Sequence, residues 1–246
     1  MQTGLNRPNL KMTLLAGLVA GLFMGLLHFA LTENVIDRAI ALEDQTAVAA
    51  GQTAGYAPVV SREIQKVMLV VGSGLYGLVV GLIFGLAFAA FGRFLPGRST
   101  VKVMALAGLL WWSVGLLTFL KYPANPPGVG DPETVYFRQT IQIVFMALSV
   151  LSIVVAWVGY LLSRRWWPSE KQRERRLALA IVGYVVLTTV LFVAMPANPD
   201  PITAPAGLVW DFRILSLSVQ AFFWAILGGV TALLLKRSLS RPPRAV

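Results

Sequence analysis

Six apolar stretches that contain no Asp, Glu, Lys or Arg most constrain how this 246-residue chain can fold. Each is 18 to 25 residues long, which matches the roughly 17–25 residues that an α-helix needs to cross a bilayer. Lipid offers no hydrogen-bond partner for backbone amides, and the stretches lack the alternation of barrel strands, so helices are expected. The six predicted spans are residues 12–32, 67–91, 103–120, 140–162, 177–195 and 214–235.

The composition excludes most other classes of protein. Hydrophobic residues make up 57% of the chain and charged residues only 13%, which fits neither a soluble globular domain nor a disordered chain. The absence of cysteine excludes thiolate metal sites and cysteine nucleophiles. We therefore predict an all-α polytopic membrane protein with six transmembrane helices, folded as a single integral-membrane domain over residues 1–246.

The loops divide into two groups by charge. The two tails and the loops at 92–102 and 163–176 carry 15 basic and two acidic residues, whereas the other three loops carry six basic and nine acidic residues. By the positive-inside rule this division predicts cytoplasmic N and C termini. The net charge of +10 is then explained by topology and contact with lipid headgroups, and a nucleic-acid partner is not expected.

An internal repeat connects the later spans. The sequence Pro-Ala-Asn-Pro occurs at residues 123–126 and again at 196–199, and each copy is followed by Phe-Arg near the start of the next span, ending at Arg138 and Arg213. The first predicted outer loop similarly delivers Arg62 before span 2. We therefore predict three helical hairpins in the same orientation, related about the membrane normal.

Each Pro-Ala-Asn-Pro is expected to stop a helix. Proline lacks a backbone donor and restricts the residue before it, so Asn125 and Asn198 should leave helical geometry. Their side-chain amides could then cap freed backbone groups or offer an oxygen atom to an ion. Inheritance of the repeat would by itself also produce two copies.

Spans 1 and 2 carry glycines at four-residue spacing, which places them on one helix face. These glycines are Gly17, Gly21, Gly25, Gly77, Gly81 and Gly85. Small residues in this register allow two helices to approach closely. We expect them to pack the first hairpin tightly or to dock a partner helix.

Potential metal ligands gather near the predicted outer ends of the spans. His28 lies four residues from the end of span 1, and beyond the span Glu33, Asp37 and Asp44 share a face with one another if the helix continues. Imidazole and carboxylate together suit a divalent first-row metal such as cobalt or nickel. The alternative is a solvated amphipathic helix with arginine partners such as Arg38, and a histidine bonded to a neighbouring helix. The candidate metal ligands are His28, Glu33, Asp37, Asn125, Asp131, Glu133, Asn198 and Asp211.

The residues do not form a recognisable catalytic constellation. The sole histidine has no evident serine nucleophile beside it, and the chain has no glycine-rich phosphate loop after a strand. We predict that the protein is not an enzyme and that it has no tightly bound cofactor.

Several segments are similar to the CbtA family of predicted cobalt transporter subunits. The most specific is residues 120–134, Leu-Lys-Tyr-Pro-Ala-Asn-Pro-Pro-Gly-Val-Gly-Asp-Pro-Glu-Thr; residues 195–197, 208–213 and the acidic stretch 33–43 are similar as well. The resemblance implies a multi-pass subunit of the cytoplasmic membrane that takes up Co²⁺ for cobalamin supply. It also implies a small single-span partner of the CbtB type with a histidine-rich tail, which would supply imidazoles to a chain that has one histidine.

Two functional hypotheses follow. In the first, the chain is a transport subunit in which Co²⁺ collects at the outer acidic groups and passes between the repeats. In the second, it is a scaffold or assembly subunit of a larger membrane complex that moves nothing. The absence of charged residues inside the spans and the glycine faces are compatible with the second hypothesis.

Overall fold

The computed structural model describes residues 8–49, 51 and 60–240, and within these ranges the chain is helical without strands. Six helices are long and apolar enough to cross a membrane, which confirms the predicted all-α, multi-pass membrane class. They cover Leu10–Ala49, Arg62–Phe94, Ser99–Lys121, Pro132–Ser163, Glu170–Ala194 and Ala206–Leu239. Each contains one of the six predicted spans, apart from Met195 at the end of the fifth.

The contacts within the chain gather into two compact units. The first comprises the described residues of Met1–Trp111, Ala124–Val129 and Ala204–Val246, and the second comprises Trp112–Pro123 and Gly130–Thr203. Both units are therefore built from segments that are separated in the sequence. The single membrane domain over residues 1–246 stays a prediction.

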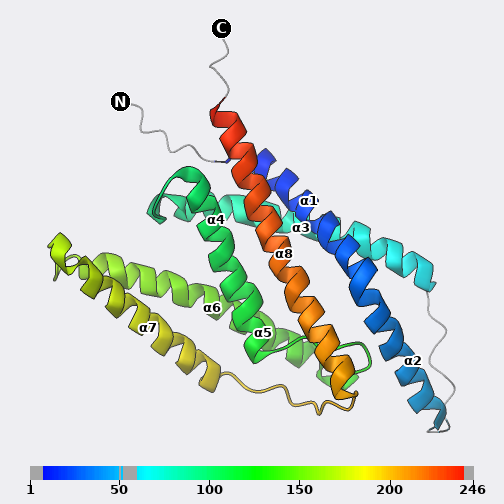
Figure 1. Ribbon diagram of the computed structural model, residues 1–246. Helices are drawn as coiled ribbons and strands as arrows, with labels where there is room; N and C mark the ends of the chain where they lie inside the picture. The colour runs from blue at the N-terminus through cyan, green and yellow to red at the C-terminus, as the bar shows by residue number, and fades with distance from the viewer. Residues whose placement is uncertain (1–7, 50, 52–59, 241–246) are drawn as a thin grey trace. The chain divides into compact units, whose positions relative to one another are not determined.

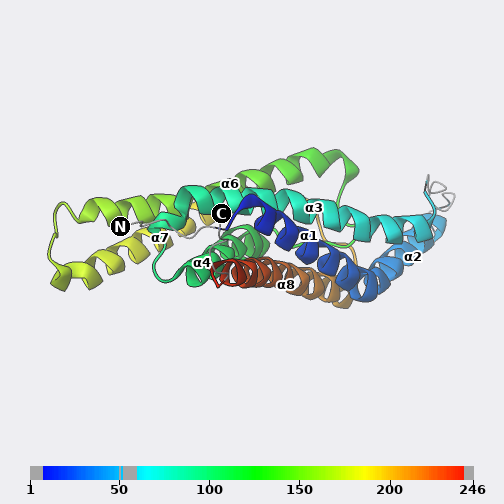
Figure 2. The same cartoon turned by 90° about the horizontal axis from the view of Figure 1, so that it is seen from above.

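In the first unit, two glycine-rich helix faces meet. Helix α1 (Leu10–Leu27) packs along α3 (Arg62–Phe91), as Figures 1 and 2 show. A Cβ atom built on Gly17 would lie 2.1 Å from the carbonyl oxygen of Gly77, and one built on Gly21 would lie 2.2 Å from that of Ser73. The two backbones are in direct contact, which confirms the predicted tight packing of the first hairpin.

Helix α8 (Ala206–Leu239) completes this unit by packing against α1 and against α4 (Ser99–Leu110). A small residue again allows the approach, since a Cβ atom on Gly228 would lie 2.8 Å from the Cβ of Ala107. The packing of the first unit is therefore complete only when the last span of the chain is in place.

Helix α1 does not end at the limit of its apolar span. It passes through the π-helical turn His28–Thr32 into α2 (Glu33–Ala49), as the long blue helix of Figure 1 shows. In α2, Val35 and Ala39 form a small core with Leu208 at the start of α8. This contact holds α2 against α8 beyond the apolar spans of both helices.

The second unit is built around α6 (Val135–Ser163) and α7 (Arg173–Ala194), which pack against each other. The short helix α5 (Thr118–Lys121) packs on α6 and continues from the π-helical segment Trp111–Leu117. Inside this unit the hydroxyl groups of Thr118 and Ser149 both donate to the carbonyl oxygen of Ser113, at 3.0 and 2.9 Å.

The ends of α5 and α7 are tied together near the Pro-Ala-Asn-Pro segments. Tyr122 packs edge-on against Phe145, and its hydroxyl donates to the carbonyl oxygen of Pro196 at 2.6 Å. Burial raises the pKa of the Tyr122 hydroxyl above its ordinary range, which extends to higher pH the range in which it can donate. Lys121 donates in parallel to the carbonyl oxygen of Phe192 at 2.7 Å.

The last two spans belong to different units. Helix α7 packs against α6 in the second unit, whereas α8 packs against α1 and α4 in the first unit. The connection between α7 and α8 is eleven residues long and non-helical, so it does not force consecutive helices to pair. Of the three predicted hairpins, the first is confirmed by the packing of α1 on α3, and the like orientation of all three stays a prediction.

Candidate functional site

Four charged side chains form a cluster at the junction of α2 and α3, which we call the Arg62 cluster. Arg62 Nη2 donates to Glu33 Oε2 at 2.5 Å and to Asp37 Oδ1 at 2.7 Å. Lys66 Nζ donates to the other carboxylate oxygen of Asp37 at 2.8 Å. The cluster therefore contains two carboxylates and two cations, and its formal charges cancel.

The local sequence explains how this cluster forms. Glu33 and Asp37 are four residues apart on α2, and Arg62 and Lys66 are four residues apart on α3, so each pair lies on one helix face. The glycine contact between α1 and α3 brings the two faces together. Only 6% of Glu33 is exposed, and its burial makes the guanidinium partner important because an unpaired buried carboxylate is unfavourable.

His28 lies one turn before the Arg62 cluster, at the first position of the π-helical turn. Its ring is half-buried, and Nδ1 is 3.0 Å from the hydroxyl oxygen of Thr32 in the same helix. The histidine thus bonds within its own helix, whereas our alternative interpretation of the sequence expected a neighbouring helix. π-helical turns of this kind occur frequently at functional sites.

Two more predicted ligands bind arginine near the start of α8. Asp211 Oδ2 accepts a hydrogen bond from Arg38 at 2.9 Å, and both side chains are about half exposed. Asn125 Oδ1 accepts from Arg213 Nη2 at 2.8 Å, and Arg213 Nε donates to the carbonyl oxygen of Ala124 at 3.2 Å. Asp211 and Asn125 are therefore both engaged by arginine, and Arg38 is the arginine that the alternative interpretation named.

In the second unit, Asp200 organises a separate group, which we call the Asp200 cluster. Its Oδ2 atom accepts hydrogen bonds from the backbone of Asp131 at 3.0 Å and from the hydroxyl of Thr134 at 2.7 Å, and lies 3.0 Å from Arg138 Nε. The loop closes on this carboxylate through Gly130, whose φ of +100° favours glycine. The carboxylate is almost entirely buried, with 6% of its side chain exposed.

The remaining predicted ligands in this unit serve the backbone or face outward. Asn198 Oδ1 accepts from the backbone N–H of Asp200 at 3.1 Å, and Asp131 Oδ1 accepts from that of Glu133 at 2.8 Å. Glu133 is exposed. The helices before the two Pro-Ala-Asn-Pro segments end at Lys121 and Ala194, which confirms that these segments stop helices. Asn198 thus bonds a backbone N–H within its own loop, and the capping of groups freed at the helix end stays a prediction for both asparagines.

Each of the two repeat arginines binds a residue in the loop of the other repeat. Arg138 follows the first Pro-Ala-Asn-Pro but binds Asp200, which follows the second, whereas Arg213 follows the second and binds Asn125 of the first. Sequence reasoning identified the repeated Phe-Arg pairs but did not assign these partners. Nor did it pair Arg62 with the acidic residues of α2, although their opposite charge at equal four-residue spacing was visible in the sequence.

The predicted metal ligands are thus distributed among several small sites. The structure brings Glu33 and Asp37 together at Arg62, and it places Asn125 and Asp211 on arginines of α8 and α2. Within the ranges that the structure describes, no group of three or more His, Asp or Glu side chains is arranged to hold a metal ion. The metal-ligand assignment therefore stays a prediction, and any ion that uses these carboxylates must compete with arginine and lysine.

Six membrane-spanning helices with ionic clusters at helix junctions define a multi-pass membrane protein whose Asp, Glu, Lys and Arg side chains lie outside the apolar spans. The chain belongs to the CbtA family, described as a probable cobalt transporter subunit, whose family model matches residues 8–236. As a subunit, a member of this family works in a transport system with partners. No curated protein and no solved structure matches the chain.

Proposed function

We propose that this protein is the membrane subunit of a divalent-metal uptake system in the cytoplasmic membrane, that its cargo is Co²⁺ destined for cobalamin supply, and that it captures the ion at its outer face. The observation that carries the proposal is the carboxylate pair of the Arg62 cluster. Glu33 and Asp37 already share one cationic partner, Arg62 Nη2, at 2.5 and 2.7 Å. A cation that replaces this nitrogen meets two anionic oxygens at once.

The chemistry of capture is an exchange of cations. An incoming divalent ion takes the carboxylate oxygens, and the displaced Arg62 and Lys66 side chains return to water, which both can reach because each remains about one-quarter exposed. His28, one turn away, adds an imidazole of the kind that cobalt accepts. A membrane potential that is negative inside favours the entry of a cation by about 2.3 kcal/mol per charge per 100 mV.

A partner completes the coordination in this proposal. Three protein ligands leave the coordination of a first-row metal ion open, and the chain has one histidine. A small single-span subunit of the CbtB type with a histidine-rich tail would supply further imidazoles at the outer face. The family's description as a subunit supports a role with partners.

Uptake of ⁵⁷Co²⁺ by cells that lack their own cobalt importers tests this function, with the chain produced alone and together with the small partner. We expect uptake that requires both chains and that falls at least about tenfold in the double variant Glu33→Gln/Asp37→Asn, because two charged ligands are lost. The matched control is Glu170→Gln/Glu174→Gln, an exposed acidic pair with the same four-residue spacing in the loop predicted to face the cytoplasm. Equal uptake by the two double variants, at equal membrane levels, would exclude the Arg62 cluster from capture.

The scaffold function is the second candidate, and one specific observation favours it. The carboxylates of Glu33, Asp37, Asp200 and Asp211 are all engaged by arginine, which is the pattern of a structural ion-pair network. This function predicts stable co-purification within a larger membrane complex, without bound metal and without cobalt uptake in any combination of chains.

A further inference from the structure

Basic residues are concentrated in the turn between α6 and α7. None of them has a role in the proposed capture of metal. Residues 163–176 contain six basic and two acidic side chains. One of the basic residues, Arg176, is only 1% exposed although it lies at the first turn of α7. A guanidinium at this depth normally has a carboxylate partner.

The carboxylate that approaches Arg176 among the described residues is that of Glu170, at the outer limit of an ion pair. Its Nη1 atom donates to the carbonyl oxygens of Trp167 and Ser169, the latter at 3.2 Å, and its Nε atom has no hydrogen-bond acceptor. The nearest acidic group, Glu170, is 3.9 Å away and 82% exposed. Water screens an exposed carboxylate at this distance, so the buried charge remains largely uncompensated.

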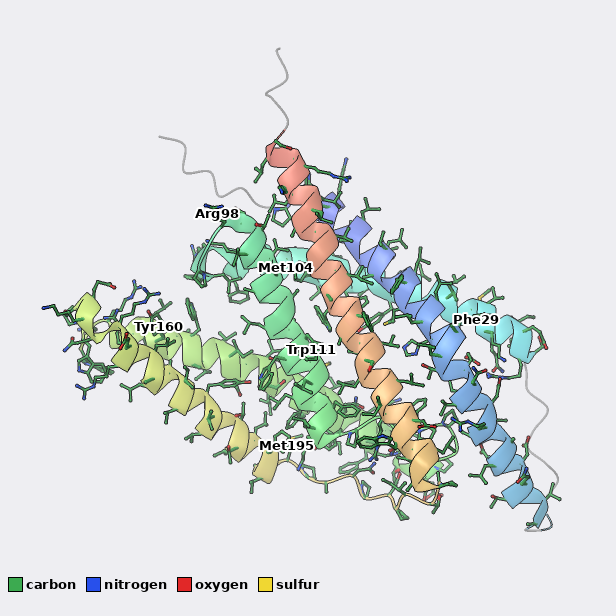
Figure 3. The ribbon with its side chains drawn as sticks, in the orientation of Figure 1. Phe29, Arg98, Met104, Trp111, Tyr160 and Met195 are labelled. Atoms are coloured by element: carbon green, nitrogen blue, oxygen red, sulfur yellow. The ribbon has the colours of Figure 1, made fainter. Side chains whose placement is uncertain are left out.

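Two further arginines approach the same place. The guanidinium carbons of Arg164 and Arg176 each lie 5.9 Å from the ring centre of Tyr160, and Arg173 lies in the same first turn of α7 as Arg176. Figure 3 shows Tyr160 near the end of α6, among side chains tipped with nitrogen. Two guanidinium groups thus flank the Tyr160 ring beside the N-terminus of the 22-residue helix α7, whose first turn adds Arg173 and whose dipole adds positive potential.

We propose that this turn binds a phosphate group, and that the group belongs to the headgroup of an anionic phospholipid. Phosphate oxygens accept paired hydrogen bonds from guanidinium groups. The neighbouring aromatic residues indicate a lipid rather than a free phosphate, because Trp166 is 73% exposed and Trp167 is held beneath Arg175 at 4.9 Å. Exposed tryptophan beside arginine is typical of the headgroup level of a membrane. Basic sites between helices on the cytoplasmic side bind lipid headgroups in this manner.

The test measures ligand binding to the purified full-length protein through its thermal unfolding. Three additions are compared: dioleoylphosphatidylglycerol, dioleoylphosphatidylcholine and inorganic phosphate. We expect phosphatidylglycerol to raise the unfolding temperature in a saturable manner and phosphatidylcholine to have no effect. Stabilisation by inorganic phosphate as strong as that by phosphatidylglycerol would assign the site to free phosphate and overturn the lipid assignment.

The decisive variant is Arg164→Gln/Arg173→Gln, because both side chains are exposed and their replacement leaves the buried Arg176 in place. Loss of two cations should weaken phosphatidylglycerol binding at least about tenfold. The matched control, Lys236→Gln/Arg237→Gln, removes two exposed cations from the last turn of α8 and should bind as the wild type does. Equal weakening in both double variants, or in neither, would overturn the proposed site, since binding would then follow net charge or avoid the turn altogether.

Discussion

Arginine side chains at the helix junctions determine how the acidic residues of this protein are held. Arg62, Arg138 and Arg213 each bind an acceptor from a different segment of their own unit. The sequence shows these arginines as a repeat, but pattern alone cannot show which loop each one reaches, because that depends on the folded path of the chain. For the same reason, the acidic residues could be named from the sequence, but the basic residues that pair with them could not.

The burial of Glu33 makes its charge structurally important. In Glu33→Gln, Arg62 loses one of two carboxylate partners, and we expect the free energy of unfolding to fall by about 1–3 kcal/mol. The matched change Asp211→Asn breaks a pair whose side chains are 58% and 48% exposed and should cost less than about 1 kcal/mol. Unfolding of both variants in the same detergent measures the difference, and a larger effect for Asp211→Asn would contradict this account.

At the scale of elements, sequence periodicity predicted the helices well and their partners less well. Spans were visible because an uninterrupted apolar run has few other structures available in lipid. The glycine register of spans 1 and 2 also predicted a contact, because two helices that each carry a face of small residues can pack closely through those faces. The packing of α8 on α4 includes the close approach of Gly228 to Ala107, and one glycine in a helix does not reveal its partner.

The α1–α3 contact gives the sharpest test of helix packing. In Gly17→Ala the new Cβ would lie 2.1 Å from the carbonyl oxygen of Gly77, so the helices must separate, and we expect a loss of about 1–3 kcal/mol in unfolding free energy. Gly72→Ala on α3 is the control, since a Cβ atom added there would have nothing within 4 Å; it should be neutral or stabilising by up to about 1 kcal/mol. A neutral result for Gly17→Ala in the detergent unfolding assay would mean that the backbones are not in contact.

At the scale of the whole molecule, the distribution of basic loops predicts which ends face the cytoplasm. The chain has no cysteine, so single cysteines can be introduced without background. We expect Thr203→Cys, in the α7–α8 connection, to react with a membrane-impermeant maleimide in intact cells, and Ser240→Cys, after α8, to react only after the membrane is opened. Both positions are exposed. Reversed labelling would place the termini on the outer side.

The interleaving of the two units also has a consequence for biogenesis. Helices α1, α3 and α4 leave the ribosome long before α8, which packs on α1 and α4, and domains generally fold in the order of their synthesis. Until translation reaches α8, the surface around Ala107 that receives Gly228 stays uncovered in the bilayer. During that interval, membrane chaperones and proteases can distinguish an unfinished chain from a finished one.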